Sequence, residues 1–270
     1  MKNGLCKKDK KNRRLYFQEL ATTSKKYYIP YIEKYKAIES NMNILEIGCG
    51  DGGNLLPFST LGCNVTGIDM AECRIKDAKD FFREANAQGR FLASDIFKFN
   101  NLNQKFDIII CHDVLEHIAD KTALLIRLKD FLSESGIIFM SFPAWQMPFG
   151  GHQQICHNRL ISHFPFIHLL PTSLYTGFLR CCNEKEETIN ELLNIKRTQC
   201  SIELFRKIAL RQGYCIVNQE LYFINPHYEV KFGLKPCKLP FIISAIPYIR
   251  NFFTTSCFYI LADSTTISGK

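Results

Sequence analysis

The alternation of short apolar runs with longer charged segments, which begins at Asn43, most constrains how this chain can fold. The apolar run 106–111 is typical of a strand that is buried on both faces of a sheet. Charged segments such as 72–87 lie between the runs and predict helices. Strands that alternate with helices at this spacing favour a mostly parallel, doubly wound sheet. We therefore predict an α/β fold.

The predicted elements leave two long segments unassigned. The strands are 43–47, 64–69, 90–95, 106–111, 136–142, 214–217 and 256–261, and the main helices are 15–38, 72–87, 120–132 and 201–212. Connections in such folds usually take about 2–6 residues. The segments 143–200 and 224–254 are therefore expected to be insertions that form a helical cap over the ligand-binding edge. We divide the chain into a basic N-terminal helical segment, 1–40, and one domain, 41–270.

The net charge of +8 is confined to the start of the chain. Residues 1–36 hold 11 basic and 3 acidic side chains, and the remaining 234 residues hold 23 of each. An excess of basic charge suits nucleic acid or an anionic membrane, but here the body of the chain is neutral. The basic segment is interpreted as a docking arm or as a solvated leader.

The twelve cysteines are scattered and form no C-x-x-C pair. This argues against a zinc ribbon and a thioredoxin-type redox site. The first residues also lack the apolar core of a signal peptide, so we expect reduced thiols and a cytoplasmic location. Since no run approaches the roughly 18 apolar residues of a transmembrane helix, no membrane-spanning segment is expected.

A cluster of glycines follows the first predicted strand, in the order Gly48-x-Gly50-x-Gly52. Glycines at this place let the backbone turn tightly and approach a ligand closely. The spacing Gly48-x-Gly50-x-x-Gly53 also fits the fingerprint of dinucleotide-binding enzymes, in which free N–H groups hold a pyrophosphate. Carboxylates at Glu46 and Asp51 oppose such an anion, and they favour a cationic ligand such as S-adenosylmethionine.

Two further carboxylates close the second and third predicted strands. Asp69 stands where a carboxylate can accept hydrogen bonds from both ribose hydroxyls. Asp95 is placed to accept a hydrogen bond from an adenine amino group. Either residue alone could equally be a cap at a strand end. Because the carboxyl ends of successive parallel strands meet at one edge, we expect both acids to face one crevice.

Residues 43–142 resemble the class I S-adenosylmethionine-dependent methyltransferases, particularly the small-molecule group that includes ubiquinone-biosynthesis-type enzymes. The resemblance is carried by LEIGCGDG at 45–52, GID at 67–69, SD at 94–95 and FDIIICHDVLEH at 106–117. It implies a Rossmann-like sheet of seven strands whose last strand, here supplied by 257–262, is antiparallel to the rest. It also implies S-adenosyl-L-methionine as the cofactor and methyl transfer as the activity.

The same resemblance implies which residues bind the cofactor. The glycines would lie against its methionine part, the two strand-end acids would bind ribose and adenine, and a histidine after the fourth strand would flank it. The predicted set is Glu46, Gly48, Cys49, Gly50, Gly52, Asp69, Met70, Asp95, Ile96 and His112. Met70 would pack on the adenine face, although a plain core position is the alternative.

The acceptor is expected to be a small molecule that is methylated on oxygen. Residues 111–115 lack the Asn/Asp-Pro-Pro-Tyr/Phe pattern of enzymes that methylate nucleic-acid amines, and no Pro-Cys dipeptide is placed to attack cytosine. Nucleic acid is therefore not expected as a partner. The alternatives are an RNA or protein methyltransferase docked through the basic segment, a catalytically silent cofactor-binding or regulatory protein, and a nicotinamide-dependent dehydrogenase.

His152 is the residue predicted to act on the acceptor. It follows two glycines in the loop after strand 136–142, and it could be a general base toward a hydroxyl or a positioning group. A histidine bonded only to backbone is the alternative. No metal is expected, because His152 and His157 with Cys156 between them match no familiar zinc spacing.

Two apolar stretches, 164–170 and 241–246, lie inside the expected cap. They could pack against each other as the core of a lid. They could instead form a pocket for an apolar or lipid-linked acceptor, or a surface for peripheral membrane contact, which the basic N-terminal segment would assist.

Overall fold

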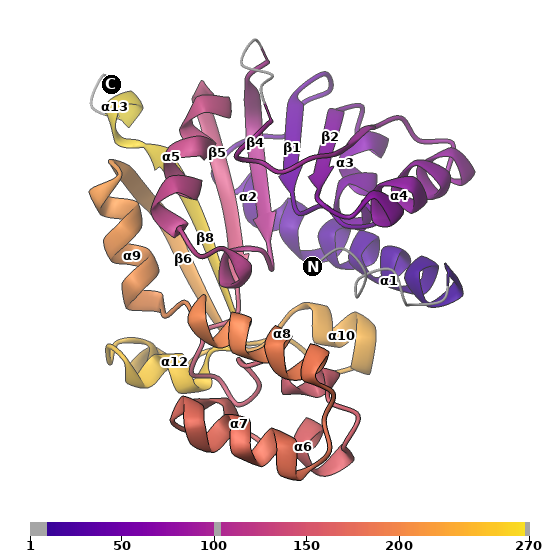
Figure 1. Ribbon diagram of the computed structural model, residues 1–270. Coiled ribbons are helices and arrows are strands. Elements are labelled where there is room, and N and C mark those ends of the chain that lie inside the picture. Colours follow the sequence, from indigo (N-terminus) through magenta and orange to yellow (C-terminus); the bar gives the residue numbers. More distant parts are fainter. Residues whose placement is uncertain (1–9, 100–103, 268–270) are drawn as a thin grey trace.

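A single mixed sheet organises the computed structural model, which describes residues 10–99 and 104–267 (Figure 1). Its strands are β1 Asn43–Ile47, β2 Asn64–Asp69, β3 Arg90–Ala93, β4 Phe106–His112, β5 Leu132–Phe142, β6 Tyr214–Ile224, β7 Cys237–Lys238 and β8 Ser256–Asp263. They lie in the order β3-β2-β1-β4-β5-β8-β6-β7. The mostly parallel α/β fold is confirmed.

The strand directions also follow the prediction. Strands β3, β2, β1, β4 and β5 are parallel to one another, and β8 is antiparallel to both β5 and β6. The last strand of the chain is thus antiparallel to the parallel set, and the short β7 is antiparallel to its neighbour β6. The predicted number of seven strands is corrected to eight, because Cys237 and Lys238 pair with the end of β6. This short edge strand lies within the predicted insertion 224–254, and two prolines flank it closely.

Helices cover both faces of the sheet, because residues of each strand alternate between the faces. Ile109 and Cys111 of β4 pack with α5 Lys121–Phe131 and α9 Ile202–Arg211 on one face. Ile108 and Ile110 pack on the other face with α1 Lys10–Thr23, α2 Ile29–Glu33, α3 Leu56–Thr60 and α4 Glu72–Glu84. The sheet is therefore buried on both faces, as the apolar run in β4 predicts.

The N-terminal segment is part of this core. Its predicted single helix, 15–38, is observed as α1, a π-helical turn at Ser24–Tyr28, and α2. Phe17, Tyr28 and Tyr31 are buried against the sheet. The basic side chains of α1 pair with acids of α4, as in Arg13–Asp77 at 2.8 Å, Arg14–Glu84 at 2.6 Å and Lys10–Asp80 at 3.1 Å. Acidic side chains within the fold therefore neutralise much of the positive charge among the described residues of this segment.

The segment after β5 folds into helices that stand apart from the sheet (Figure 1). Helices α6 Arg159–His163, α7 Thr172–Cys181 and α8 Glu186–Arg197 enclose a separate small core of Cys156, Ile161, Ile167, Tyr175, Leu179, Ile189 and Leu192. Helices α10 His227–Phe232, α11 Phe241–Ser244 and α12 Ile249–Phe253 come from the second insertion, and α13 Ser264–Ile267 ends the described chain. We refer to 143–200 and 224–254 together as the cap.

Two sequence expectations concern thiols and membranes. Ten described cysteines are free, but Cys73 is disulfide-bonded, which corrects the expectation that the thiols are all reduced. Among residues 10–99 and 104–267, no helix combines the length and the apolar character that crossing a bilayer requires.

Candidate functional site

The glycine loop after β1 adopts a backbone that favours glycine at each predicted position. Gly48, Gly50 and Gly52 have φ values of +67°, +52° and +84°, in the left-handed region where side chains are disfavoured. A Cβ atom on Gly48 would lie 2.3 Å from Val114 Cγ2, and one on Gly50 would lie 2.3 Å from the Arg74 guanidinium. A side chain at either position would therefore collide with Val114 or Arg74, so the packing of the loop as well as its backbone requires glycine.

Asp69 is held against this loop at the end of β2. One carboxylate oxygen accepts a hydrogen bond from the Gly50 N–H at 2.9 Å, and the other accepts one from the Ala71 N–H at 2.8 Å. The carboxylate thus links the glycine loop to the start of α4. The structure brings together the two motifs that the sequence places 19 residues apart.

Glu46 and Asp51 are buried acidic residues at the same loop. Glu46 Oε1 accepts a hydrogen bond from Asn54 at 2.7 Å, whereas Oε2 has no hydrogen-bond partner among the described residues. Burial raises the pKa of Glu46 to about 8. Asp51 forms an ion pair with Arg74 at 3.4 Å, and burial raises its pKa as well. Near pH 7 the Glu46 carboxyl is therefore largely protonated in the absence of a ligand, and the other acid of the loop is paired with Arg74.

The predicted adenine residues follow β2 and β3. Met70 is 62% exposed, so it is not a core residue. Asp95 accepts a hydrogen bond from the Phe97 N–H at 3.0 Å, which is the capping role that the sequence left open, and its side chain remains partly exposed. Ile96 and Cys49 are buried, so they contribute chiefly to the walls beneath the loop.

His112 ends β4 and contacts the N-terminal segment. Its Nε2 atom lies 2.7 Å from the hydroxyl oxygen of Tyr28. Tyr28 is fully buried, and His112 is 8% exposed. The aromatic residues between the early lysines were visible in the sequence as a pattern, but only the fold shows that one of them orients His112.

Helix α1 also lies over the glycine loop. A Cβ on Gly53 would lie 2.5 Å from the Phe17 carbonyl oxygen, so the two backbones are in close contact. Burial raises the pKa of the Tyr16 phenol, and the carboxylates of Asp113 and Asp51 act in the same direction. No sequence motif singled out Tyr16.

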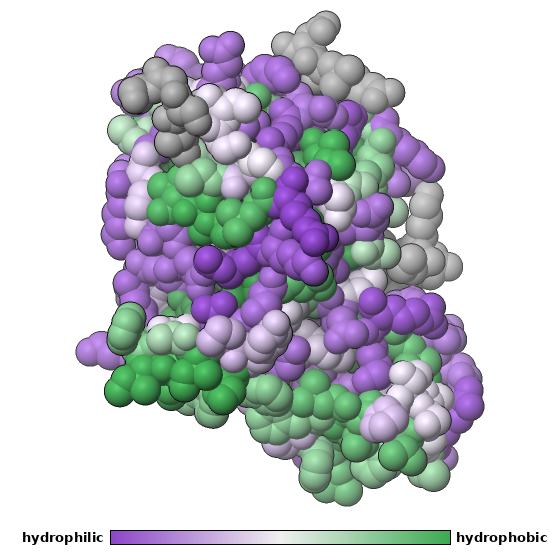
Figure 2. Space-filling model, turned by 90° about the vertical axis from the view of Figure 1, so that its left-hand side faces the viewer, coloured by the Kyte–Doolittle hydropathy of each residue, from purple (hydrophilic) through white to green (hydrophobic). Residues whose placement is uncertain are grey.

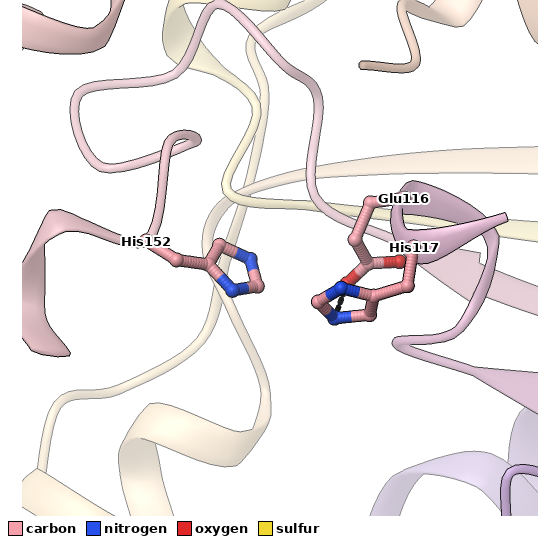
Figure 3. Close-up of side chains that lie close together, drawn as sticks. All are labelled: Glu116, His117 and His152. Atoms are coloured by element: carbon pink, nitrogen blue, oxygen red, sulfur yellow. Dashed lines mark ion pairs between the residues drawn. The ribbon is translucent and has the colours of Figure 1, made fainter. Parts of the chain in front are cut away.

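A second group of side chains lies on the cap side of β4, shown in Figure 3. Glu116 and His117 belong to the 3₁₀ turn Leu115–His117, and His152 comes from the loop after β5. Each offers one ligand atom such that all these atoms lie within 4.8 Å of one another. The rings of His117 and His152 meet edge to face with centroids 5.2 Å apart. Sequence reasoning singled out His152 but not this grouping.

The environment of His152 favours the neutral imidazole. Burial lowers its pKa to about 4, and the neighbouring His117 acts in the same direction. Its backbone has φ +57°, in the left-handed region that non-glycine residues seldom adopt. Strained backbone of this kind concentrates at functional sites.

Known proteins share this arrangement of sequence and fold. A model of the methyltransferase domain family matches residues 12–169, more than half of the 270-residue chain. Similar sequences include two ubiquinone biosynthesis O-methyltransferases. That of Rickettsia akari (strain Hartford) is 29% identical over 102 residues, and that of Bartonella tribocorum (strain CIP 105476 / IBS 506) is 33% identical over 101 residues. The matches cover 38% and 37% of this chain, and 40% and 41% of the relatives, so less than half of either relative is matched.

Solved structures share the fold over most of the chain. The magnesium protoporphyrin IX methyltransferase of Synechocystis PCC 6803 with bound SAH has a TM-score of 0.53 at 15% identity, and the match covers 91% of this chain and 84% of that one. The plantazolicin methyltransferase BpumL in complex with SAH has a TM-score of 0.53 at 15% identity, with 94% and 87% covered. At these identities the likeness is one of fold. Because the family model spans more than half of the chain, this protein belongs to the methyltransferase domain family.

Proposed function

We propose that this protein is an S-adenosylmethionine-dependent methyltransferase that acts on an oxygen atom of a small molecule. The observation that carries the proposal is the glycine loop with positive φ at Gly48, Gly50 and Gly52, tied through the Gly50 N–H to the Asp69 carboxylate. Family membership supports methyl transfer, and the names of the curated relatives support oxygen as the acceptor atom.

The residues present fit this cofactor. Glu46 Oε2 is a buried oxygen that lacks a hydrogen-bond partner among the described residues. This feature suits a ligand with a cationic methionine portion. We propose that Glu46, Gly48, Cys49, Gly50 and Gly52 surround that portion. Asp69 would bind the ribose, Met70, Asp95 and Ile96 would contact the adenine, and His112 would flank the cofactor.

The bound cofactor supplies a methyl group on a sulfonium, which is already activated for transfer. The chain must therefore align the acceptor oxygen, exclude water and, for a hydroxyl, take up a proton. We propose that His152 faces the acceptor from the cap. An imidazole with a pKa of about 4 is a weak base near pH 7, so of its two predicted roles we favour positioning of the acceptor.

We further propose an apolar or lipid-linked acceptor, reached at a membrane surface. Phe241, Ile242 and Tyr248 of the cap are 84%, 76% and 68% exposed. Figure 2 shows apolar surface gathered toward the cap end of the molecule. Exposed apolar patches of this kind mark interaction sites. The cytoplasmic location stays a prediction.

The cofactor proposal is tested by calorimetry with S-adenosylhomocysteine and with NAD. Heat with S-adenosylhomocysteine and none with NAD is the expected result, and heat with NAD alone would sink the proposal. The acceptor is tested by incubating the protein with labelled S-adenosylmethionine and cell extract. Label in the lipid or small-molecule fraction supports the proposed acceptor class, whereas label confined to RNA or protein contradicts it.

A further inference from the structure

We propose that His227 binds the acceptor through its Nε2 atom, which accepts a hydrogen bond from the hydroxyl group that is methylated. His227 is the first residue of α10 and lies in the second insertion of the cap. Helices α1 and α10 lie side by side (Figure 1). This role rests on the proposed function, because it names a residue that holds the acceptor of the methyl group.

The Nε2 atom of His227 is buried and has no hydrogen-bond partner among the described residues. The residue is only 9% exposed. The Glu19 carboxylate lies 4.0 Å from Nε2, which is beyond hydrogen-bond distance. A buried polar atom without a hydrogen bond is costly, so a ligand that supplies a donor at this place would gain affinity.

Thr23 fixes which nitrogen of the ring carries the hydrogen. The Thr23 hydroxyl donates its single hydrogen to the Glu19 carbonyl oxygen at 2.8 Å. The same hydroxyl oxygen lies 2.9 Å from Nδ1 of His227, where it can only accept, so Nδ1 carries the hydrogen. In the neutral ring Nε2 then has a free lone pair and cannot donate. A ligand at Nε2 therefore needs an O–H or N–H group.

The environment of His227 keeps the ring neutral. Burial lowers its pKa to about 4, and the nearby His112 acts in the same direction. Near pH 7 the lone pair of Nε2 is therefore available. The neutral ring also adds no positive charge that would repel a sulfonium.

The contacts of the N-terminal segment attach His227 to the strand ends. Ser24, which follows the threonine that binds His227, donates to the Asn54 carbonyl oxygen at 2.8 Å, just after the glycine loop. Four residues further along the chain, Tyr28 contacts His112 at the end of β4. His227 is thus bonded to the segment that connects the glycine loop with the end of β4, where an acceptor must meet the methyl group.

The start of α10 holds the ring in a defined orientation. The Asn225 side chain accepts a hydrogen bond from the His227 N–H at 2.9 Å. Glu229, in the same helix, pairs with Lys26 at 2.8 Å. The ring packs edge to face with Tyr16, and the two centroids are 5.9 Å apart. Because these contacts orient Nε2 before a ligand binds, less entropy is lost on binding.

Two groups of the proposed ligands carry a suitable hydrogen, the acceptor hydroxyl and the ammonium of the cofactor. The ammonium is suited to the buried Glu46 carboxyl, since opposite charges stabilise each other there. An uncharged hydroxyl is suited to the uncharged Nε2 of His227. The hydroxyl is therefore the group assigned to His227.

The same hydrogen bond gives the hydroxyl proton a destination. An oxygen that gains a bond to carbon becomes positively charged, and its proton is then more acidic than that of an imidazolium. A weak base therefore suffices at this stage. The O–H bond breaks, its electron pair stays on the oxygen, and an N–H bond forms at Nε2 of His227. The Glu19 carboxylate, 4.0 Å from Nε2 on a side chain that is 17% exposed, would pass the proton to solvent.

The test compares two substitutions that preserve different parts of the imidazole. His227→Asn keeps a donor near the position of Nδ1 and removes Nε2, whereas His227→Gln keeps an acceptor near the position of Nε2. Each full-length variant is incubated with labelled S-adenosylmethionine and with the small-molecule and lipid fractions of cell extract. His227→Asn should lower the initial labelling rate by about a hundredfold, the lower end of what a positioned proton-transfer group contributes. His227→Gln should lose less.

His163→Asn, at an exposed histidine of α6, is the matched control and should label at the rate of the unmodified protein. Calorimetry with S-adenosylhomocysteine on the same samples should show unchanged affinity in His227→Asn, which also confirms that the variant is folded. An unchanged labelling rate in His227→Asn would reject the role of His227 alone. A lost affinity for S-adenosylhomocysteine in a folded His227→Asn would place Nε2 on the cofactor and overturn the inference. If the unmodified protein labels neither fraction, the proposed function itself fails.

Discussion

The strand-end wall of the site and its cap-side wall carry opposite kinds of titratable groups. The carboxyl wall consists of Glu46, Asp51 and Asp69, at the ends of β1 and β2. The histidine wall consists of His117 and His152, and the fully buried His168 packs behind the loop that carries His152. Burial raises the pKa of Glu46 to about 8 and lowers the pKa of His152 and of His168 to about 4. The same physical cause therefore acts in opposite directions on the two walls.

This difference assigns different chemistry to the two walls. A cationic ligand stabilises the ionised form of a buried carboxyl group whose oxygen has no hydrogen-bond partner. Neutral imidazoles can orient a hydroxyl, and they add no positive charge that would repel a sulfonium. The wall that binds the cofactor and the wall that meets the acceptor can thus be disturbed separately by pH and by substitution.

The largest expected effect concerns Glu46. Its pKa is about 8 in the folded protein against an ordinary value of 4.5, so the folded protein keeps a proton that the unfolded chain loses. The stability that this provides is complete below about pH 4.5 and is lost as the pH rises through 8. Glu46→Gln should therefore make the cofactor-free protein more stable at pH 9 by on the order of 4 kcal/mol. Urea unfolding between pH 5 and pH 9 measures the effect.

Asp130→Asn provides the control for this measurement. Asp130 is a half-exposed carboxylate that pairs with Arg127 on α5, away from the strand ends. Its substitution should leave the pH dependence as in the unmodified protein. Equal slopes for the unmodified protein and Glu46→Gln would show that Glu46 is ionised in the fold, and the proposed contrast between the walls would fail.

The second largest effect on stability concerns His168, and its dependence on pH is opposite to that of Glu46. His168 is fully buried, and its Nε2 lies 2.8 Å from the Trp145 carbonyl oxygen. Because its pKa is about 4 in the fold, its contribution is present above pH 6.5 and is lost as the pH falls toward 4. About 3 kcal/mol is expected over this range. His168→Gln should remove much of this loss.

The single tryptophan makes this effect visible. Trp145 packs edge to face on His168 with ring centroids 4.7 Å apart, so its fluorescence reports on the cap. In the unmodified protein the fluorescence should change between pH 6.5 and pH 4, and in His168→Gln it should change much less. His163→Gln, at an exposed histidine, should behave like the unmodified protein. A change of the same size in all three proteins would contradict the prediction.

The two walls also differ in how far the sequence predicts them. The glycine loop and Asp69 could be found because their roles depend on backbone conformation and strand ends, which a local pattern reports. The Gly50–Asp69 bond joins two such local features through the parallel pairing of β1 and β2. The parallel direction of the first five strands follows from the same regular alternation.

The cap side could not be predicted in this way. Glu116 and His152 meet because irregular loops return to the same edge, and no periodic pattern reports such a meeting. A search for metal ligands at short spacing considers His152 with His157, but the structure groups it with Glu116 and His117. Tyr28 likewise meets His112 across 84 residues, through packing of the N-terminal helices.

The third prediction concerns the affinity for the cofactor and tests the role of the carboxyl wall. Asp69→Ala removes the acceptor of the Gly50 and Ala71 N–H groups and the proposed ribose ligand. Hydrogen bonds to a charged group contribute about 1.5–3 kcal/mol each, so affinity for S-adenosylhomocysteine should fall by about a hundredfold. The Trp145 fluorescence and its pH response should be retained. Unchanged affinity by calorimetry, with Asp130→Asn as the control, would remove Asp69 from the cofactor site.

The smallest effect on stability is expected at the apolar surface of the cap. Phe241 is 84% exposed, whereas Phe139 of β5 is fully buried between sheet and helices. Phe241→Ser should therefore change the free energy of unfolding by no more than about 0.5 kcal/mol, while Phe139→Ala should cost about 3–5 kcal/mol. Packing within the folded protein therefore does not explain a phenylalanine at position 241. If it serves membrane contact, Phe241→Ser should reduce co-sedimentation with anionic vesicles and leave binding of S-adenosylhomocysteine intact. Equal sedimentation of the unmodified protein and Phe241→Ser would reject the membrane role. It would not bear on the roles proposed for the carboxyl wall and the histidine wall.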